Sequence, residues 1–194
     1  MTKQKSMNEI LKKGAYIIFL ILVSSCGANK DQNNTKVNTH SNSKYKKSRV
    51  AYSGTLNRTE YDKLIKNLEE ELKTTIPDNK SILINYNQKA PNCINVRFNK
   101  NDNRKVTKNR ISISSRMSSD YNAIDFFVYT NDSYNREIYE QMDEFILDSG
   151  FFYKNVFTEH QNCAGFLIIK PNGEFYQQYG EDYYSEVKTF FKKE

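Results

Sequence analysis

The chain has 194 residues, with 29 basic and 23 acidic side chains, and this length suits one ordinary domain with flanking segments. The first 25 residues hold four of the lysines and one of the glutamates, so the other 169 residues carry 25 basic and 22 acidic side chains. Such a small excess of positive charge excludes any inference of nucleic-acid binding from composition.

The first segment combines lysines, an apolar run, a pair of small residues and a cysteine. The lysines are Lys3, Lys5, Lys12 and Lys13, the run covers residues 14–23, and Ser24-Ser25 precede Cys26. The run is short for a bilayer, and this order of features is typical of an export signal. The alternative is an amphipathic or membrane-spanning helix with an incidental cysteine.

Residues 23–26, Val-Ser-Ser-Cys, resemble the lipobox of bacterial lipoproteins. The resemblance covers residues 1–26 only. It implies a signal peptide over residues 1–25 and acyl chains such as palmitate on Cys26. It also implies a protein of the cell envelope, anchored by lipid on the exported side of a membrane, either periplasmic or on the outer surface.

Residues 26–48 are predicted to form the acylated N-terminus and a flexible tether. Val37 is their single aliphatic branched residue, and most of the others are Asn, Lys, Ser or Thr. Such a segment cannot bury enough apolar surface to offset the loss of conformational entropy on ordering. The globular domain is therefore expected over residues 49–194.

The first elements expected in the domain are a helix and a buried strand. Apolar residues recur at helical spacing at Tyr61, Leu64, Ile65, Leu68 and Leu72. We expect Thr59 to cap this helix with Asp62 as its acidic partner, and Pro77 to stop it. Residues 81–86 form a compact apolar run, typical of a strand buried on both faces. Cys93 then lies in a loop beyond that strand.

Residues 94–119 allow two interpretations. Residues 94–98 alternate like a half-buried strand, and residues 111–113 could return as its partner after a turn at 99–103. Alternatively, one helical stripe contains Val106, Arg110, Ile113 and Met117. The serine-rich composition weakens the helix. The first half stays open between the two, and the second half favours the helix.

The signals are clearer in the second half of the domain. Residues 123–129 are predicted to form a core strand. A helix ending at Gly150 should follow, with an apolar face of Ile138, Met142, Phe145 and Ile146. Residues 151–161 look irregular. Asn172-Gly173 predicts a hairpin between strands at 165–170 and 174–179. The last helix, over 181–192, should bury Tyr183, Val187, Phe190 and Phe191.

This order of elements predicts a layered α/β domain with a parallel strand pair and an antiparallel hairpin. Residues 59–194 resemble a thioredoxin-like fold. The strand at 82–86 with Cys93 beyond it is similar to the first core strand and redox loop of that family, and residues 166–175 with the last helix are similar to its closing hairpin and helix. The family's Cys-x-x-Cys is absent, and residues 162–165 take the place of its cis-proline.

Cys93 and Cys163 are the candidate site. An even pair of cysteines in an exported chain is most simply a disulfide. The thioredoxin-like order would bring their loops to one end of the sheet. A structural bridge closing a loop of about 70 residues would stabilise the fold by about 4 kcal/mol on the chain-entropy model. The alternatives are a redox-active or unpaired pair, and a metal site with His160 that lacks a fourth ligand.

No complete catalytic motif, cofactor motif or metal motif is present. We therefore expect a membrane-anchored bacterial lipoprotein with a non-catalytic binding or interaction domain of degenerate thioredoxin-like fold. The alternative is a thiol–disulfide redox protein or sensor that uses Cys93 and Cys163, the one enzyme class with some support. The expected partners are the membrane, through the lipid, and an unidentified envelope protein or ligand, with no nucleic acid.

Overall fold

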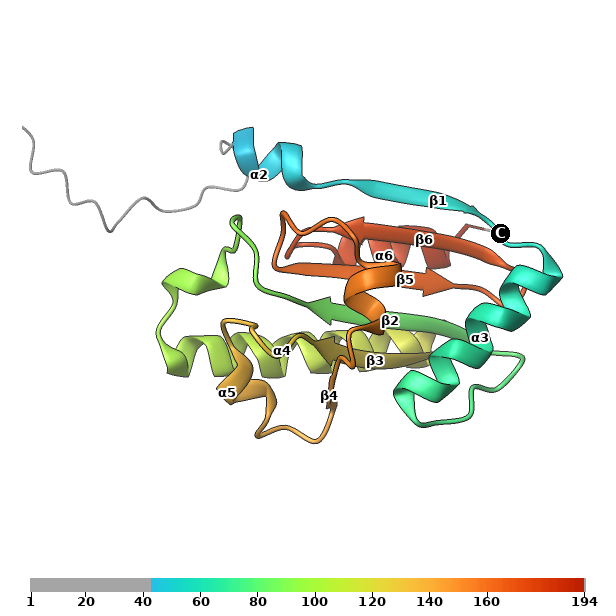
Figure 1. The fold of residues 1–194 in the computed structure, drawn as a ribbon, viewed down its shortest axis with the longest axis horizontal. Helices are drawn as coiled ribbons and strands as arrows, with labels where there is room; N and C mark the ends of the chain where they lie inside the picture. Colours follow the sequence, from blue (N-terminus) through green and yellow to red (C-terminus); the bar gives the residue numbers. More distant parts are fainter. Residues whose placement is uncertain (1–42, 194) are drawn as a thin grey trace, which may run out of the picture. The chain divides into compact units, whose positions relative to one another are not determined.

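The structure, a computed structural model, describes residues 43–193, so the predicted signal peptide and Cys26 lie outside the described residues. The elements in chain order are α2 (Ser43–Ser48), β1 (Ala51–Thr55), α3 (Arg58–Leu72), β2 (Ser81–Asn87), a short 3-10 helix (Asn95–Arg97), α4 (Lys100–Asp120), β3 (Ala123–Tyr129), α5 (Arg136–Tyr139), β4 (Phe145–Leu147), a π-helical turn (Phe152–Val156), β5 (Ala164–Ile169), β6 (Glu174–Tyr179) and α6 (Tyr184–Phe191) (Figure 1). Within residues 43–193, no helix is both long and apolar enough to span a membrane.

Six strands form one mixed sheet in the order β1-β6-β5-β2-β3-β4. β2 and β3 are parallel and α4 crosses between them, whereas β5 pairs with β2 in the antiparallel direction. β5 and β6 form the predicted hairpin, which turns at Gly173 with a φ of 87°. The architecture is the thioredoxin-like layered α/β fold that the sequence predicted, and β1 and β4 form the two edges of the sheet.

All seven residues of β2 are buried, as the sequence predicted, because helices cover both faces of the sheet. Figure 1 shows α3 and the π-helical turn in front of the sheet and α6 behind it. Ile82, Ile84 and Tyr86 belong to the apolar cluster on the α3 side. Leu83 belongs to the cluster that includes residues of α4 and α6. The strand therefore separates two packing layers.

The helix α3 starts earlier than predicted. Asn57 is the N-cap: its side chain accepts a hydrogen bond of 3.0 Å from the Glu60 amide, and the Glu60 side chain accepts one of 2.9 Å from the Asn57 amide. The expectation of Thr59 as the cap is therefore wrong. Asp62, its expected partner, pairs instead with Arg58. The reciprocal Asn–Glu pair satisfies two free amides at the start of the helix.

Residues 94–119 contain no strand. Residues 100–120 form α4, and the side chain of Asn99 caps it by accepting a hydrogen bond from the Asp102 amide. The helix interpretation of the second half is confirmed. The spacing of apolar residues gave only a weak signal for this helix, because the face that it buries is largely polar. That face consists of Asn103, Thr107, Ser114, Met117 and Ser118.

The predicted helix ending at Gly150 is wrong. α5 ends at Tyr139, and Phe145 lies in β4, which pairs in parallel with β3. Phe145 stacks on Tyr139 with ring centroids 4.3 Å apart. The apolar side chains thus form an aromatic cluster at the sheet edge, and a short apolar run allows either structure. The two core strands, the hairpin and the last helix are confirmed.

The segment before residue 49 is not entirely a tether. Residues 43–48 form α2, and Tyr45 is only 1% exposed. Its hydroxyl donates a 2.9 Å hydrogen bond to Asp182. The tether prediction rested on the average composition of residues 26–48, which does not reveal that one tyrosine is buried. The remainder of the predicted tether, residues 26–42, lies outside the described residues.

Candidate functional site

Cys93 and Cys163 form a disulfide, as the sequence predicted, with Cα atoms 5.1 Å apart. Cys93 follows β2 and Cys163 directly precedes β5, so the bridge lies at the carboxyl end of β2. The two residues are 8% and 4% exposed, and Ala90 packs against them. The bridge therefore joins two loops in a shielded position.

Backbone hydrogen bonds join the same two loops. The Gln88 amide donates to the Cys163 carbonyl at 2.8 Å, and the Asn92 amide donates to the Gln161 carbonyl at 3.2 Å. The side chains of Gln88 and Asn92 donate to carbonyls of the same loop, those of Asn162 and Gln161. The disulfide is thus one of several links between these loops.

The carbonyl oxygen of Ala90 lies 2.9 Å from the Cys93 sulfur and 3.7 Å from the Cys163 sulfur. Neither sulfur of a disulfide has a hydrogen to donate, so these are contacts in the oxidised chain. In the dithiol form, the same carbonyl is in place to accept a thiol hydrogen.

Glu181 brings a carboxylate to the disulfide. A carboxylate oxygen of Glu181 and both sulfurs all lie within 4.8 Å of one another. Glu181 follows β6, and its Oε1 accepts a 2.6 Å hydrogen bond from the Ile94 amide. Burial raises the pKa of Glu181 to about 7, while the amides of Ile94 and Asn95 and the charge of Arg110 partly oppose this rise. The carboxylate therefore changes charge near neutral pH.

Arg110 organises a polar network beside this carboxylate. Its guanidinium donates to the Asn87 side chain at 3.0 Å and to the Tyr183 hydroxyl at 2.9 Å. The Tyr183 hydroxyl donates to Asn85 at 2.6 Å, and Asn85 donates to Ser114 on α4 at 2.9 Å. Arg110 is partly exposed as a residue, but its Nε is shielded from solvent. The network connects β2, α4 and the start of α6.

A pocket of about 470 Å³ opens next to the loop that carries Cys93. One wall comes from Val96, Phe98, Lys100 and Asn103, and the other from residues 133–138. Val96, Phe98 and Tyr134 are 48%, 45% and 49% exposed. Lys100 and Glu137 form an ion pair of 2.6 Å between the two walls. The disulfide fixes the loop at Cys93, and the residues of the first wall follow directly after this loop.

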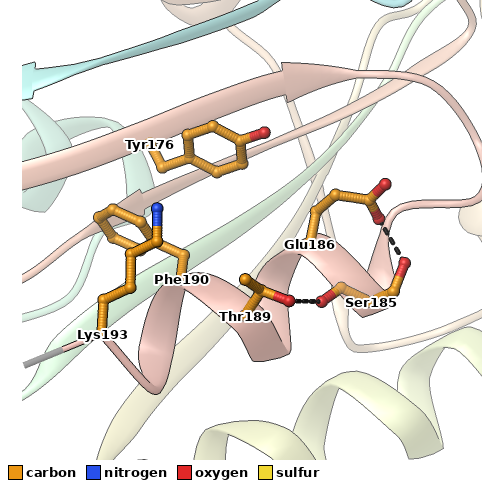
Figure 2. A pocket seen from close by; sticks show the side chains of 6 residues that line it. All are labelled: Tyr176, Ser185, Glu186, Thr189, Phe190 and Lys193. Carbon is orange, nitrogen blue, oxygen red and sulfur yellow. Dashed lines mark hydrogen bonds between the residues drawn. The ribbon is translucent and has the colours of Figure 1, made fainter.

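A second pocket, of about 230 Å³, lies between β6 and α6 (Figure 2). Figure 2 shows its polar groups bonding to each other: Ser185 donates to Glu186, and Thr189 donates to the Ser185 carbonyl. Tyr176 stacks on Phe190 across the pocket, with ring centroids 5.4 Å apart. The Tyr176–Phe190 stack therefore attaches α6 to the sheet, whereas the two hydrogen bonds lie within α6.

Of the three candidate site residues suggested by the sequence, the structure brings two together and places the third elsewhere. Cys93 and Cys163 come together, whereas His160 bonds to Gln88 and stacks on Tyr153, outside the group of candidate ligand atoms that includes Glu181. Sequence reasoning missed Glu181 and Arg110 because no short motif contains them. Comparison with protein-family models and with curated proteins finds no match for this chain.

Proposed function

We propose that this chain is a membrane-anchored lipoprotein of the bacterial cell envelope whose thioredoxin-like domain binds a partner without catalysis. The observation that carries the proposal is the shielded Cys93–Cys163 disulfide at the carboxyl end of β2. Dithiol catalysis requires a thiolate to attack an accessible sulfur. Here both sulfurs are shielded, and residues 43–193 contain no further cysteine.

The pocket beside Cys93 supports a binding role. Val96, Phe98 and Tyr134 leave large apolar surfaces in contact with water, and apolar and aromatic groups of this kind are enriched at the centres of protein interfaces. The neighbouring Lys100–Glu137 pair supplies a polar rim. A partner from the envelope with an apolar side chain or group at its surface suits this pocket.

Photocrosslinking in cells tests the binding role. We expect a photoreactive amino acid at Phe98 or Tyr134 to give a discrete crosslinked product. The matched control is the same amino acid at Tyr52, which is 44% exposed but lies on β1, away from the pocket walls. Equal products at the control position, or none at the pocket positions, would contradict a partner at this pocket.

Fatty-acid labelling tests the anchor. Acylation and the subsequent cleavage of a lipoprotein leader both act at the lipobox cysteine. We therefore expect the wild-type chain to take up labelled fatty acid and Cys26→Ser to remain unlabelled and uncleaved. Circular dichroism of both chains is the control for folding, and the two spectra should agree. Equal labelling of both chains would contradict the anchor.

Glu181 favours a second function, reversible thiol–disulfide chemistry. Its carboxylate lies within reach of both sulfurs and can exchange a proton with a thiol formed there. The reduction potential separates the two functions. A value below about −300 mV indicates a structural bridge, and a clearly higher value indicates a redox pair.

A further inference from the structure

After reduction of the disulfide, the two sulfurs and a nearby carboxylate oxygen could serve together as metal ligands. The two sulfurs and a Glu181 oxygen lie within 4.8 Å of one another. They come from three separate segments, after β2, before β5 and after β6. Convergence of two thiols and a carboxylate from distant segments is the pattern of a metal site, and three protein ligands leave a fourth position open.

We infer that the reduced chain binds one zinc-like divalent ion through Cys93, Cys163 and Glu181. Thiolates are soft ligands, which select zinc over magnesium or calcium, and a carboxylate completes the zinc ligand sets of several kinds of site. This inference goes beyond the binding role proposed above and does not depend on it.

The charges around the site balance when the ion is bound. Two thiolates and one carboxylate around a doubly charged ion leave a net charge of −1. The Arg110 guanidinium, which interacts electrostatically with Glu181, supplies the opposite charge. The Ile94 amide bonds to Oε1 of Glu181 at 2.6 Å, and the Asn95 amide also interacts with this carboxylate, so backbone amides orient the group that lies beside both sulfurs.

The ligands stay close when the disulfide is open. The loops of Cys93 and Cys163 remain joined by the hydrogen bonds of Gln88 and Asn92, which do not involve either sulfur. A ligand set held by other contacts binds an ion at a smaller entropic cost.

Metal binding and disulfide formation exclude each other. Cys93 and Cys163 are synthesised as thiols, and closing the bridge passes two electrons and two protons from them to an oxidant such as a second disulfide. A dithiol reverses this step by supplying two electrons and two protons as it becomes a disulfide itself. A phosphine does so by supplying two electrons as it becomes a phosphine oxide, with the oxygen and the two protons coming from water. Metal binding instead releases the two thiol protons to the buffer and forms two sulfur–metal bonds. The ion therefore protects both sulfurs from oxidation.

Cobalt(II) titration tests the inference on the full chain carrying Cys26→Ser, in which Cys93 and Cys163 are the remaining thiols. The chain is reduced with a phosphine, freed of reductant without air, and titrated with cobalt. We expect a thiolate-to-cobalt charge-transfer band and the visible bands of a four-coordinate ion, saturating at one cobalt per chain and lost on adding zinc. The oxidised chain should show neither band. Absence of the bands in the reduced chain would overturn the inference.

Variants test the three ligands. Glu181→Gln should lower cobalt affinity at least about tenfold, as loss of a metal-site group typically does. Glu144→Gln, which changes an exposed carboxylate outside the candidate ligand set, should leave the affinity unchanged. Cys93→Ser should weaken the charge-transfer band, because one of the two thiolates remains. An affinity that Glu181→Gln does not change would overturn the proposed ligand set.

Circular dichroism covers the case in which reduction unfolds the domain. Recovery of the native spectrum on adding zinc to the reduced chain would support a site that folding and metal binding share. A reduced chain that stays unfolded with zinc would overturn the inference.

Discussion

The two faces of β2 differ in the contacts they make. Ile82, Ile84 and Tyr86 enter an apolar cluster under α3, whereas Asn85 and Asn87 bond to a network that includes Arg110. Apolar packing is non-directional and scales with buried area, but each buried polar group needs a matching partner. Both faces of the strand thus pack against apolar clusters, and the face of Leu83, Asn85 and Asn87 also positions polar groups. Arg110, which bonds to Asn87, also interacts with Glu181 beside the disulfide.

Loss of the disulfide should cause the largest decrease in unfolding free energy, because it removes the covalent link between the loops of Cys93 and Cys163. We expect Cys93→Ala, Cys163→Ala and the double variant each to lose about 4 kcal/mol of unfolding free energy, since each removes the same bridge between residues 70 apart. Unfolding should stay cooperative, because a chain of this size has a sufficient core. Urea unfolding measures the loss.

Mass spectrometry after alkylation provides the control for the bridge. The denatured but unreduced wild-type chain should leave Cys93 and Cys163 unmodified. Modification of both in a sample kept from reductant would show that the bridge does not form in solution.

Ile84→Ala probes the apolar face. The side chain is fully buried in the cluster under α3, so its truncation should cost about 3 kcal/mol through lost burial and a residual cavity. Val106→Ala is the exposed aliphatic control and should change the unfolding free energy by less than about 0.5 kcal/mol. Similar losses for the two variants would contradict the packing described for β2.

Asn85→Leu probes the polar face at the next residue. The substitution keeps the volume similar but leaves the Tyr183 hydroxyl and Ser114 without their partner, at a cost of about 2 kcal/mol. Asn109→Leu, on the exposed side of α4, is the control. A double-mutant cycle with Tyr183→Phe should be non-additive, because both changes remove the same bond. Strict additivity would show that the bond contributes nothing.

Glu181 should produce a gradual pH dependence in the oxidised chain, with a smaller change in unfolding free energy over any one pH unit than the losses above. Its folded-state pKa of about 7 lies above the ordinary value of 4.5, so the unfolded chain binds fewer protons between these pH values. Stability should therefore fall as pH rises from about 5 to about 7, by at most about 1.4 kcal/mol per pH unit. Urea midpoints at several pH values, in buffer with a metal chelator, measure the slope.

Glu181→Gln should flatten that slope, and Glu137→Gln should leave it as in the wild type. Burial raises the pKa of Glu181, whereas the Lys100 side chain holds the pKa of the exposed Glu137 below its usual range. An unchanged slope in Glu181→Gln would assign the pH dependence to other groups.

Hydrophobic patterning predicted the apolar half of this molecule well. The runs at 81–86 and 123–129 identified the two parallel strands, and Asn172-Gly173 identified the hairpin. These elements depend on local composition and period, which a single sequence contains. The layered thioredoxin-like fold followed from their order.

The polar half could not be predicted in the same way. α4 buries Asn103, Thr107 and Ser114, so its buried face does not appear in a hydrophobic pattern. Glu181 meets Cys93 and Cys163 only because three segments converge in space. The pairing of the cysteines was predictable from their number and their loops, but the carboxylate beside them required the structure.

The hydroxyl of Tyr45 gives the domain a mechanical property. It accepts a 2.9 Å hydrogen bond from the Glu181 amide and donates one of 2.9 Å to Asp182, so α2 is fastened to the residue that faces the disulfide. Arg49, just after α2, adds an ion pair of 2.9 Å to Glu186. A pulling force applied to the chain before residue 43 therefore reaches α2 first, and the hydrogen bond of Tyr45 passes it to the backbone of Glu181, the residue beside the two sulfurs.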